Sequence, residues 1–134
     1  MNNQETICLL LVEDNPLDVF LFRESLAKLS DTRVQLIHAE RVTEALGLLR
    51  QHAVDLILTD LNLPDAIGRE AVQRLVAEAA EVPVLALTGQ QDKELEAQLL
   101  SDGACSVLAK DHFATSSLAD ALHQWVRDKG GAQS

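Results

Sequence analysis

The sequence has few cysteines, few basic residues and no long hydrophobic run, and each shortage excludes a class of protein. Two cysteines in 134 residues are too few for a disulfide-stabilised scaffold. Only 11 residues are basic and 21 are acidic, which gives a net charge of -10. Nucleic acids and anionic membrane surfaces attract positive charge, so this chain is a poor candidate for direct contact with either of them.

The longest apolar run also argues against a membrane protein. It covers residues 7–12, whereas a transmembrane helix needs about 20 apolar residues. No positive charge precedes this run, so the N-terminus does not resemble a signal peptide, and we expect a cytoplasmic protein. Cys8 and Cys105 both lie in apolar runs, and we expect them to be buried and reduced.

A regular alternation of two apolar patterns fills the chain instead. Five short runs rich in Val, Ile and Leu lack a clean polar alternation, which is typical of strands covered on both faces of a parallel sheet. They span residues 7–12, 34–39, 54–59, 82–87 and 105–109. Stripes with helical spacing follow four of these runs. Their members are Val19, Phe22, Leu26 and Leu29; Val42, Ala45, Leu46 and Leu49; Val72, Leu75, Val76 and Ala79; and Leu118, Ala121, Leu122 and Trp125. The charged segment 92–102 predicts a fifth, more solvated helix.

The residues at the ends of these segments support the same assignment. Asn15 followed by Pro16 is typical of a helix N-cap and first helical position, and Gly103 suits the position after a helix. The sequence therefore predicts a (βα)5 α/β fold, with an open parallel sheet and helices on both faces. We expect a single domain over residues 1–134, in which 129–134 is a tail or the beginning of a linker.

Polar side chains gather where the predicted strands end, and in such folds the functional site lies there. Glu13 and Asp14 follow the first strand and Asp60 follows the third. Three carboxylates at one edge repel one another unless a cation lies among them, and Mg²⁺ prefers such oxygen ligands. Thr88 and Lys110, at the ends of the last two strands, could contact a phosphoryl group. Each of these residues alone is more often a helix cap or a surface charge. Their occurrence together at the ends of four strands is what indicates a functional site.

These strand ends also resemble a known family. The segments 10–16, 58–65 with Gly68, 84–89 and 108–110 match, in order and spacing, the receiver domain of bacterial two-component response regulators. The resemblance covers roughly residues 6–128, which we take as the core of the domain. It implies a flavodoxin-like, doubly wound five-stranded sheet with the strand order 2-1-3-4-5.

The resemblance also implies a role for each site residue. Asp60 takes the position of the phosphoacceptor, Thr88 that of the switch hydroxyl, and Lys110 that of the lysine that pairs with the phosphoryl group. The implied Mg²⁺ ligands are Glu13, Asp14, Asp60 and the backbone carbonyl of Asn62. The implied product is an aspartyl phosphate, which would switch the surface of the domain that contacts an output domain or a partner.

The partners follow from the same resemblance. The phosphodonor is expected to be a sensor histidine kinase or a His phosphotransfer protein, and an output domain is expected in a longer parent chain. A homodimer is expected through the face of the fourth helix, the fifth strand and the last helix. The domain is expected to be a signalling module that catalyses only its own phosphoryl transfer and autodephosphorylation, and therefore not an enzyme.

Three positions depart from the commonest family pattern. Val107 stands where the family often has Tyr or Phe, Asp111 stands where a cis proline is common, and Glu13 replaces Asp. We expect a trans bond after Lys110 and a different loop there. We also expect a signal that is either relayed by backbone or loop shifts or weak. The alternative is a receiver-like interaction module that works without phosphorylation. A phosphatase with an aspartyl intermediate is disfavoured, because Asp60-Leu61-Asn62 lacks a second aspartate for acid–base work.

Overall fold

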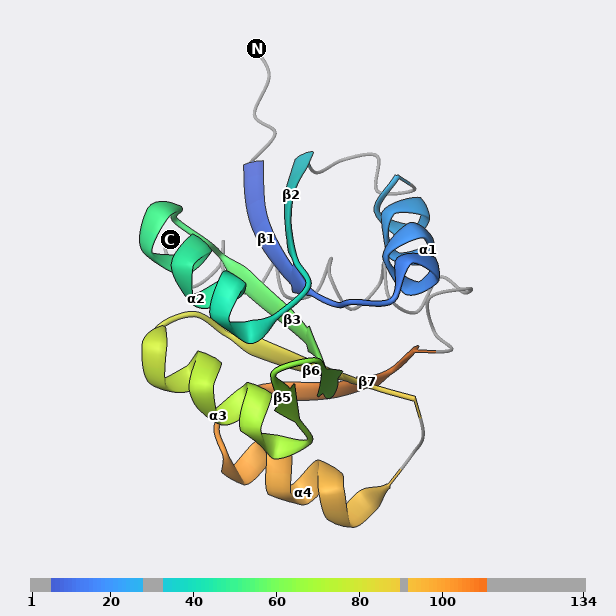
Figure 1. Cartoon of the computed structure of the whole chain (residues 1–134), viewed down its shortest axis with the longest axis vertical. Helices are drawn as coiled ribbons and strands as arrows, with labels where there is room; N and C mark the ends of the chain where they lie inside the picture. The colour runs from blue at the N-terminus through green and yellow to red at the C-terminus, as the bar shows by residue number, and fades with distance from the viewer. Residues whose placement is uncertain (1–5, 28–32, 90–91, 111–134) are drawn as a thin grey trace, which may run out of the picture.

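The computed structural model describes residues 6–27, 33–89 and 92–110, in which strands and helices alternate (Figure 1). In chain order the elements are β1 (Thr6–Val12), α1 (Pro16–Leu26), β2 (Arg33–Ala39), α2 (Val42–Gln51), β3 (Leu56–Asp60), β4 (Asn62–Leu63), β5 (Ala66–Ile67), α3 (Arg69–Glu78), β6 (Val84–Thr88), α4 (Lys93–Ser101) and β7 (Ser106–Ala109). One five-stranded sheet has the order β2-β1-β3-β6-β7, and its neighbouring strands are all parallel. The predicted α/β fold and the order 2-1-3-4-5 of the long strands are confirmed.

Helices cover both faces of this sheet, and the side chains of β1 divide between them. Leu9 and Leu11 pack with Phe22 of α1 in one apolar cluster. Leu10 and Val12 belong to a second cluster, which buried residues of α2, α3 and α4 complete. Because β1, β3 and β6 are covered on both sides, they are buried almost throughout, as their continuous apolar runs predict.

The predicted boundary residues act at the ends of the helices. Pro16 is the first residue of α1, and Asn15 Oδ1 accepts hydrogen bonds from the backbone N–H groups of Leu17 and Asp18. Gly103 follows α4 with a φ of 114°, a conformation that favours glycine. The charged segment 92–102 is indeed helical, since it contains all of α4, whose single buried residue is Leu99.

Three details differ from the sequence-based expectation. β3 and β6 begin and end later than predicted, so that Asp60 and Thr88 are the last residues of their strands. Cys8 is buried, but the prediction for Cys105 was wrong because its side chain is exposed. Cys105 precedes β7, which pairs with β6 alone among the described strands and therefore lies at an edge of the sheet.

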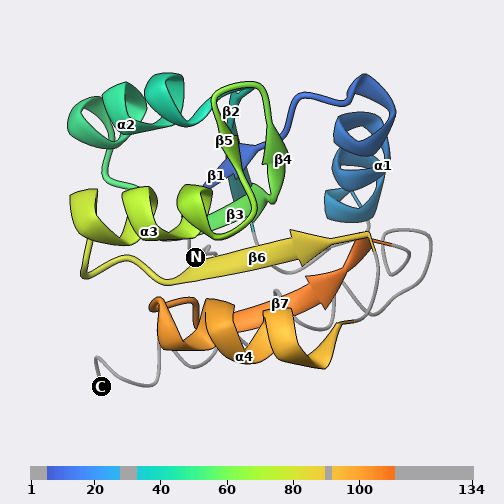
Figure 2. The same ribbon diagram turned by 60° about the horizontal axis from the view of Figure 1, so that its bottom comes forward.

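A small hairpin that the sequence analysis did not predict follows β3 directly (Figure 2). Asn62 pairs with Ile67, and Leu63 with Ala66, in antiparallel register. Gly68 closes the hairpin with a φ of 66°. Strands of two residues are too short to show a periodic pattern, so hydrophobic periodicity could not predict them.

Other expectations concern residues outside the described ranges. The last apolar stripe (Leu118, Ala121, Leu122 and Trp125), the bond to Asp111 and the segment 129–134 all lie there. Within the described ranges, no helix combines the length and the apolar character that crossing a membrane requires.

Candidate functional site

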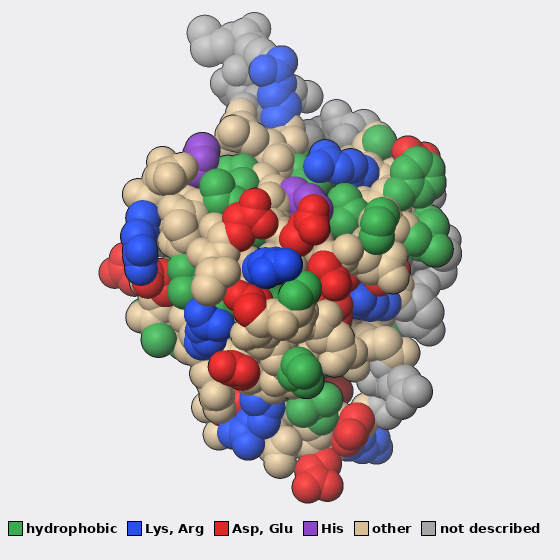
Figure 3. All heavy atoms as spheres, in the orientation of Figure 1, with side chains coloured by type: hydrophobic (Ala, Val, Ile, Leu, Met, Phe, Trp, Pro, Cys, Tyr) green, Lys and Arg blue, Asp and Glu red, His purple; other side chains and the backbone are tan. Residues whose placement is uncertain are grey.

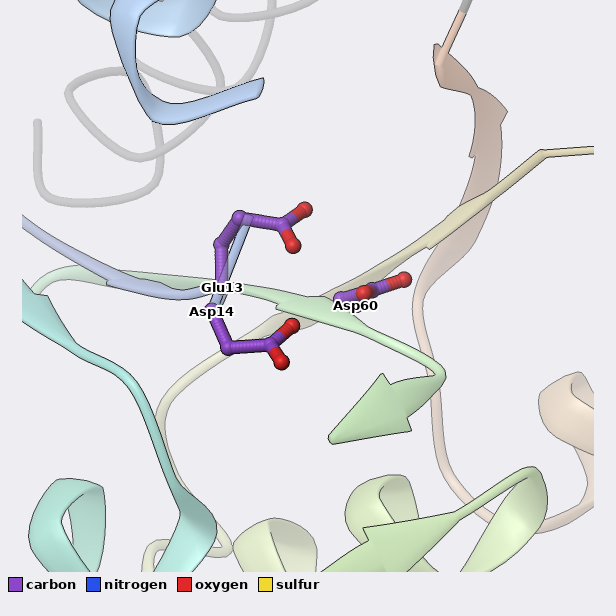
Figure 4. Close-up of side chains that lie close together, drawn as sticks. All are labelled: Glu13, Asp14 and Asp60. Carbon is purple, nitrogen blue, oxygen red and sulfur yellow. The ribbon is translucent and has the colours of Figure 1, made fainter. Parts of the chain in front are cut away.

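Three carboxylates meet at the carboxyl edge of the sheet (Figure 4). Glu13 and Asp14 directly follow β1, and Asp60 is the last residue of β3. One carboxylate oxygen from each residue lies within 4.8 Å of the others. Glu13 and Asp60 are buried and Asp14 is exposed, so solvent reaches the cluster from the side of Asp14.

The register of the parallel strands explains this meeting. Val12 lies opposite Thr59 in the pairing of β1 with β3, so the next residues, Glu13 and Asp60, come side by side. A backbone hydrogen bond from the N–H of Glu13 to the carbonyl of Ala39 holds the end of β1 against β2. Two acidic residues far apart in sequence are therefore fixed by the rigid centre of the sheet.

Lys110, which follows β7, brings a positive charge into the same cluster. Its Nζ lies 2.8 Å from Glu13 Oε1 and 3.1 Å from Asp60 Oδ1. It also donates a hydrogen bond of 2.8 Å to Asp18 Oδ2 on α1. Lys110 therefore connects the ends of β1 and β3 with the first turn of α1, and all four of these side chains are mostly shielded from solvent.

Burial and mutual repulsion change the acid–base behaviour of this cluster. Burial, aided by the charge of Asp60, raises the pKa of Glu13 to about 7, against the opposing effect of Lys110. Burial alone would lower the pKa of Lys110, but the hydrogen bonds to Asp18 and Glu13 and the charge of Asp60 raise it above its usual value. Lys110 therefore stays charged, and Glu13 takes up a proton more readily than an ordinary glutamate does.

Two other predicted residues lie at the same edge. Thr88 is half-buried at the end of β6, where it lies opposite Ala109 in the register with β7. Asn62 begins the hairpin two residues after Asp60, and its side chain is exposed. The backbone N–H of Leu61 donates a hydrogen bond of 2.7 Å to Asp60 Oδ1, which fixes the orientation of that carboxylate.

The residues present fit a hard divalent cation. Carboxylate oxygens are the ligands that Mg²⁺ and Mn²⁺ prefer, and the cluster offers one from each of three side chains. Glu13 Oε1 is buried, and Lys110 Nζ lies 2.8 Å from it. One ammonium group shared by Glu13, Asp18 and Asp60 leaves an excess of negative charge in a shielded site, and a cation would offset the cost of burying it.

Two acidic residues with structural contacts were missed in the sequence. Asp18 pairs with Lys110, which is 92 positions away in the chain. Asp65, at the tip of the hairpin, accepts hydrogen bonds from the backbone N–H groups of Val42 and Thr43 at the beginning of α2. Neither contact leaves a local pattern, because each joins segments that only the fold brings together.

Comparison with known proteins points to one family. Residues 9–123 match the family model described as the response regulator receiver domain. The polar-differentiation response regulator DivK of Brucella ovis is 33% identical over 125 residues, which are 92% of this chain and 98% of DivK. The glycerol metabolism activator of Pseudomonas putida is 31% identical over 120 residues, and the match covers 87% of this chain. The chain spans only 52% of the length of that activator.

Solved structures of response regulators are also similar to this chain. The Mn²⁺-bound form of the response regulator Rcp1 is 28% identical with a TM-score of 0.69, and the match covers 81% of this chain and 87% of Rcp1. The phosphorylated cyanobacterial phytochrome response regulator RcpA is 25% identical with the same TM-score of 0.69, and the match covers 90% of this chain and 89% of RcpA.

Proposed function

This chain belongs to the response regulator receiver domain family, and from that premise we propose that Asp60 is its phosphoacceptor in a two-component system. The proposal depends on one observation, which is that Lys110 lies beside the carboxylate cluster at the carboxyl edge of the sheet. Lys110 Nζ is 3.1 Å from Asp60 Oδ1. Phosphoryl transfer depends mainly on positioning and on charge stabilisation, and this arrangement supplies both.

In the proposed reaction, an oxygen of Asp60 attacks the phosphorus of a phosphohistidine. A new O–P bond forms while the P–N bond breaks, and the imidazole nitrogen keeps the electron pair and takes up a proton. The N–H of Leu61 holds the carboxylate of Asp60 in place, and Lys110 balances the negative charge on the phosphoryl oxygens. The hydroxyl of Thr88 is assigned to donate a hydrogen bond to one of them.

The proposed metal ligands are Glu13, Asp14, Asp60 and the backbone carbonyl of Asn62. Bound Mg²⁺ would offset the charges of the carboxylates and of the transferred group. The Mn²⁺-bound form of Rcp1 supports this assignment, because Mg²⁺ and Mn²⁺ share a preference for oxygen ligands. Glu13 is long enough to act directly or through a metal-bound water.

The phosphodonor, a sensor histidine kinase or a His phosphotransfer protein, is proposed to contact α1. Leu17 and Phe20 are exposed on this helix, with 62% and 57% of their surfaces accessible, and apolar side chains gather over it in Figure 3. The same helix carries Asp18 beside the site, so a donor that reaches Asp60 would cover this surface. Phe20→Ala should slow transfer from an autophosphorylated histidine kinase and leave the reaction with acetyl phosphate unchanged.

The central proposal is tested by incubating the protein with Mg²⁺ and either acetyl phosphate or phosphoramidate, which has a P–N bond like phosphohistidine. Intact-mass analysis should show one added phosphoryl group, and Asp60→Asn should abolish it. Glu24→Gln is a control that removes an exposed negative charge on α1. Unmodified wild-type protein, under conditions that modify another receiver domain, would overturn the proposal.

The domain is proposed to turn over only its own phosphoryl group and therefore to lack a separate substrate. Steady-state hydrolysis of a phosphate ester such as p-nitrophenyl phosphate should remain at the level of the Asp60→Asn variant. We infer further that an output domain or a partner binds the modified surface, in line with relatives of which the match covers only about half. Part of the predicted dimer face, the last helix, lies outside the described residues.

A further inference from the structure

We propose that Asp18 is a positioning residue for Lys110, because its carboxylate holds the lysine ammonium group where the transferred phosphoryl group arrives. The inference rests on the proposed function, since it concerns the lysine of the same site. Asp18 lies in the first turn of α1, outside the cluster of Glu13, Asp14 and Asp60 that is assigned to the metal.

The contacts of Lys110 single out Asp18 among its neighbours. Nζ donates a hydrogen bond to Asp18 Oδ2 at 2.8 Å. Nζ also lies 2.8 Å from Glu13 Oε1 and 3.1 Å from Asp60 Oδ1, but both of these carboxylates belong to the cluster that is assigned to the cation. The side chains of Lys110 and Asp18 are only 19% and 20% exposed, so solvent screens their attraction weakly.

The local structure of α1 fixes Asp18 relative to the site. The N–H of Asn15 donates a hydrogen bond of 3.2 Å to Glu13 Oε2, and Asn15 Oδ1 accepts one of 3.4 Å from the N–H of Asp18. Pro16 limits the backbone between them. The carboxylate of Asp18 therefore sits on a rigid helix turn that is tied to a proposed metal ligand.

The three carboxylates around Lys110 have different tasks in the proposed reaction. The ammonium group has three donors and meets three carboxylates. Glu13 and Asp60 are the proposed ligands of the cation, and Asp60 also becomes esterified to the phosphoryl group. Asp18 alone among these three can keep its full charge directed at Lys110 throughout the reaction. Without it, the long flexible lysine side chain loses its fixed anchor.

The chemistry of the test reaction shows how Asp18 acts. With acetyl phosphate, a bond forms between an oxygen of Asp60 and phosphorus, and the bond from phosphorus to the acetate oxygen breaks. Acetate leaves with the electron pair, and Lys110 keeps all of its protons. Lys110 therefore contributes through the position of its charge, and Asp18 affects the rate by fixing that position.

The first experiment measures the pair in metal-free protein by thermal unfolding. Asp18→Asn should lower the melting temperature when Lys110 is present. The same change should fail to lower it in the Lys110→Met background, where only repulsion between carboxylates is removed. Equal effects of Asp18→Asn in both backgrounds would show that the pair does not form, and would overturn the inference.

The second experiment measures the rate of phosphorylation by acetyl phosphate with Mg²⁺, followed by intact mass. Asp18→Asn should react about tenfold more slowly, because Lys110 is less well placed. Asp18→Glu, which restores the charge, should recover at least half of the wild-type rate. Glu24→Gln is the matched control, because it removes one negative charge from the same helix away from the site, and it should react like wild type.

The outcomes separate the two proposals. If wild-type protein is not modified, the proposed function fails. If wild type reacts and Asp18→Asn reacts equally fast, Asp18 is a structural partner only and the inference fails alone. A faster reaction of Asp18→Asn would show that its main effect is to repel the anionic donor, which also contradicts a positioning role.

Discussion

The hairpin that follows the proposed phosphoacceptor caps a distant helix, and this contact allows a quantitative test. Asp65 Oδ1 and Oδ2 accept hydrogen bonds of 3.0 and 2.9 Å from the N–H groups of Val42 and Thr43 at the beginning of α2. Arg41, the residue before this helix, offers no side-chain cap of its own. Asp65 therefore does for α2 what Asn15 does for α1, but from 22 to 23 positions away.

Replacing Asp65 with Ala removes both acceptors and the negative charge at the N-terminus of α2. Loss of a helix cap costs about 1–2 kcal/mol, and the charge favours a helix N-terminus by a further fraction of that. For a domain of this size, the expected decrease in melting temperature is roughly 3–8 °C. Asp65→Asn keeps one carbonyl oxygen as an acceptor, so the decrease in melting temperature for this variant should be intermediate.

The pH dependence of this effect has a defined sign. Burial alone would raise the pKa of Asp65, but the hydrogen bonds from Thr43 and Val42 outweigh it and lower the pKa below its usual value. The stabilising contribution is therefore complete above the usual pKa and is lost as the pH falls through the lowered value. The difference in free energy of unfolding between wild type and Asp65→Ala should be constant near neutral pH and shrink in acid.

The assay is urea unfolding of metal-free protein, followed by far-UV circular dichroism at neutral and acidic pH. Asp92→Ala, which removes a cap within its own segment at the start of α4, is a useful comparison. Identical unfolding midpoints for wild type, Asp65→Ala and Asp65→Asn at neutral pH would refute the reasoning. A loss that is independent of pH would show that the charge of Asp65 does not contribute.

Three further predictions concern the site and the cysteines. Asp60→Asn should raise the melting temperature of metal-free protein, because it removes one charge from a crowded cluster while Lys110 keeps Glu13 and Asp18; a decrease would contradict this. The apparent affinity for Mg²⁺, measured by titration calorimetry, should fall about tenfold from about pH 8 to about pH 6. The reason is that a proton competes with the metal ion for Glu13, whose pKa is raised to about 7. A constant affinity would show that Glu13 is ionised throughout this range. Iodoacetamide should alkylate exposed Cys105 far faster than buried Cys8, whose pKa is raised by burial and by Asp55. The assay is peptide mapping of native protein after alkylation, and equal rates at the two cysteines would contradict the burial of Cys8.

The general fold could be predicted because burial on both faces leaves a strong signal. The runs that became β1, β3 and β6 are apolar without alternation, and these strands occupy the centre of the sheet. Their exact ends could not be predicted, because apolar residues also fill the loops before them. Val54 is buried although it precedes β3, and Val82 packs against the core although it precedes β6.

The main members of the site could be predicted for a topological reason. Parallel strands end at one edge, so the residues that follow them must be neighbours, and the structure brings Glu13, Asp14, Asp60 and Lys110 together there. Asp18 could not be predicted in this way. It lies inside a helix, and its contact with Lys110 depends on how α1 packs on the sheet rather than on strand order.

The charges of the site argue for a bound cation independently of the family resemblance. Four carboxylates gather here, from Glu13, Asp14, Asp18 and Asp60. Lys110 supplies one ammonium group, which forms ion pairs with Glu13, Asp18 and Asp60. Burial and the charge of Asp60 raise the pKa of Glu13, so uptake of a proton by this carboxylate is one way to relieve the imbalance. A divalent cation would relieve the same imbalance more fully and would displace that proton. We therefore expect a proton and the proposed metal ion to compete for one buried carboxylate, so that acidification empties the site before it unfolds the domain.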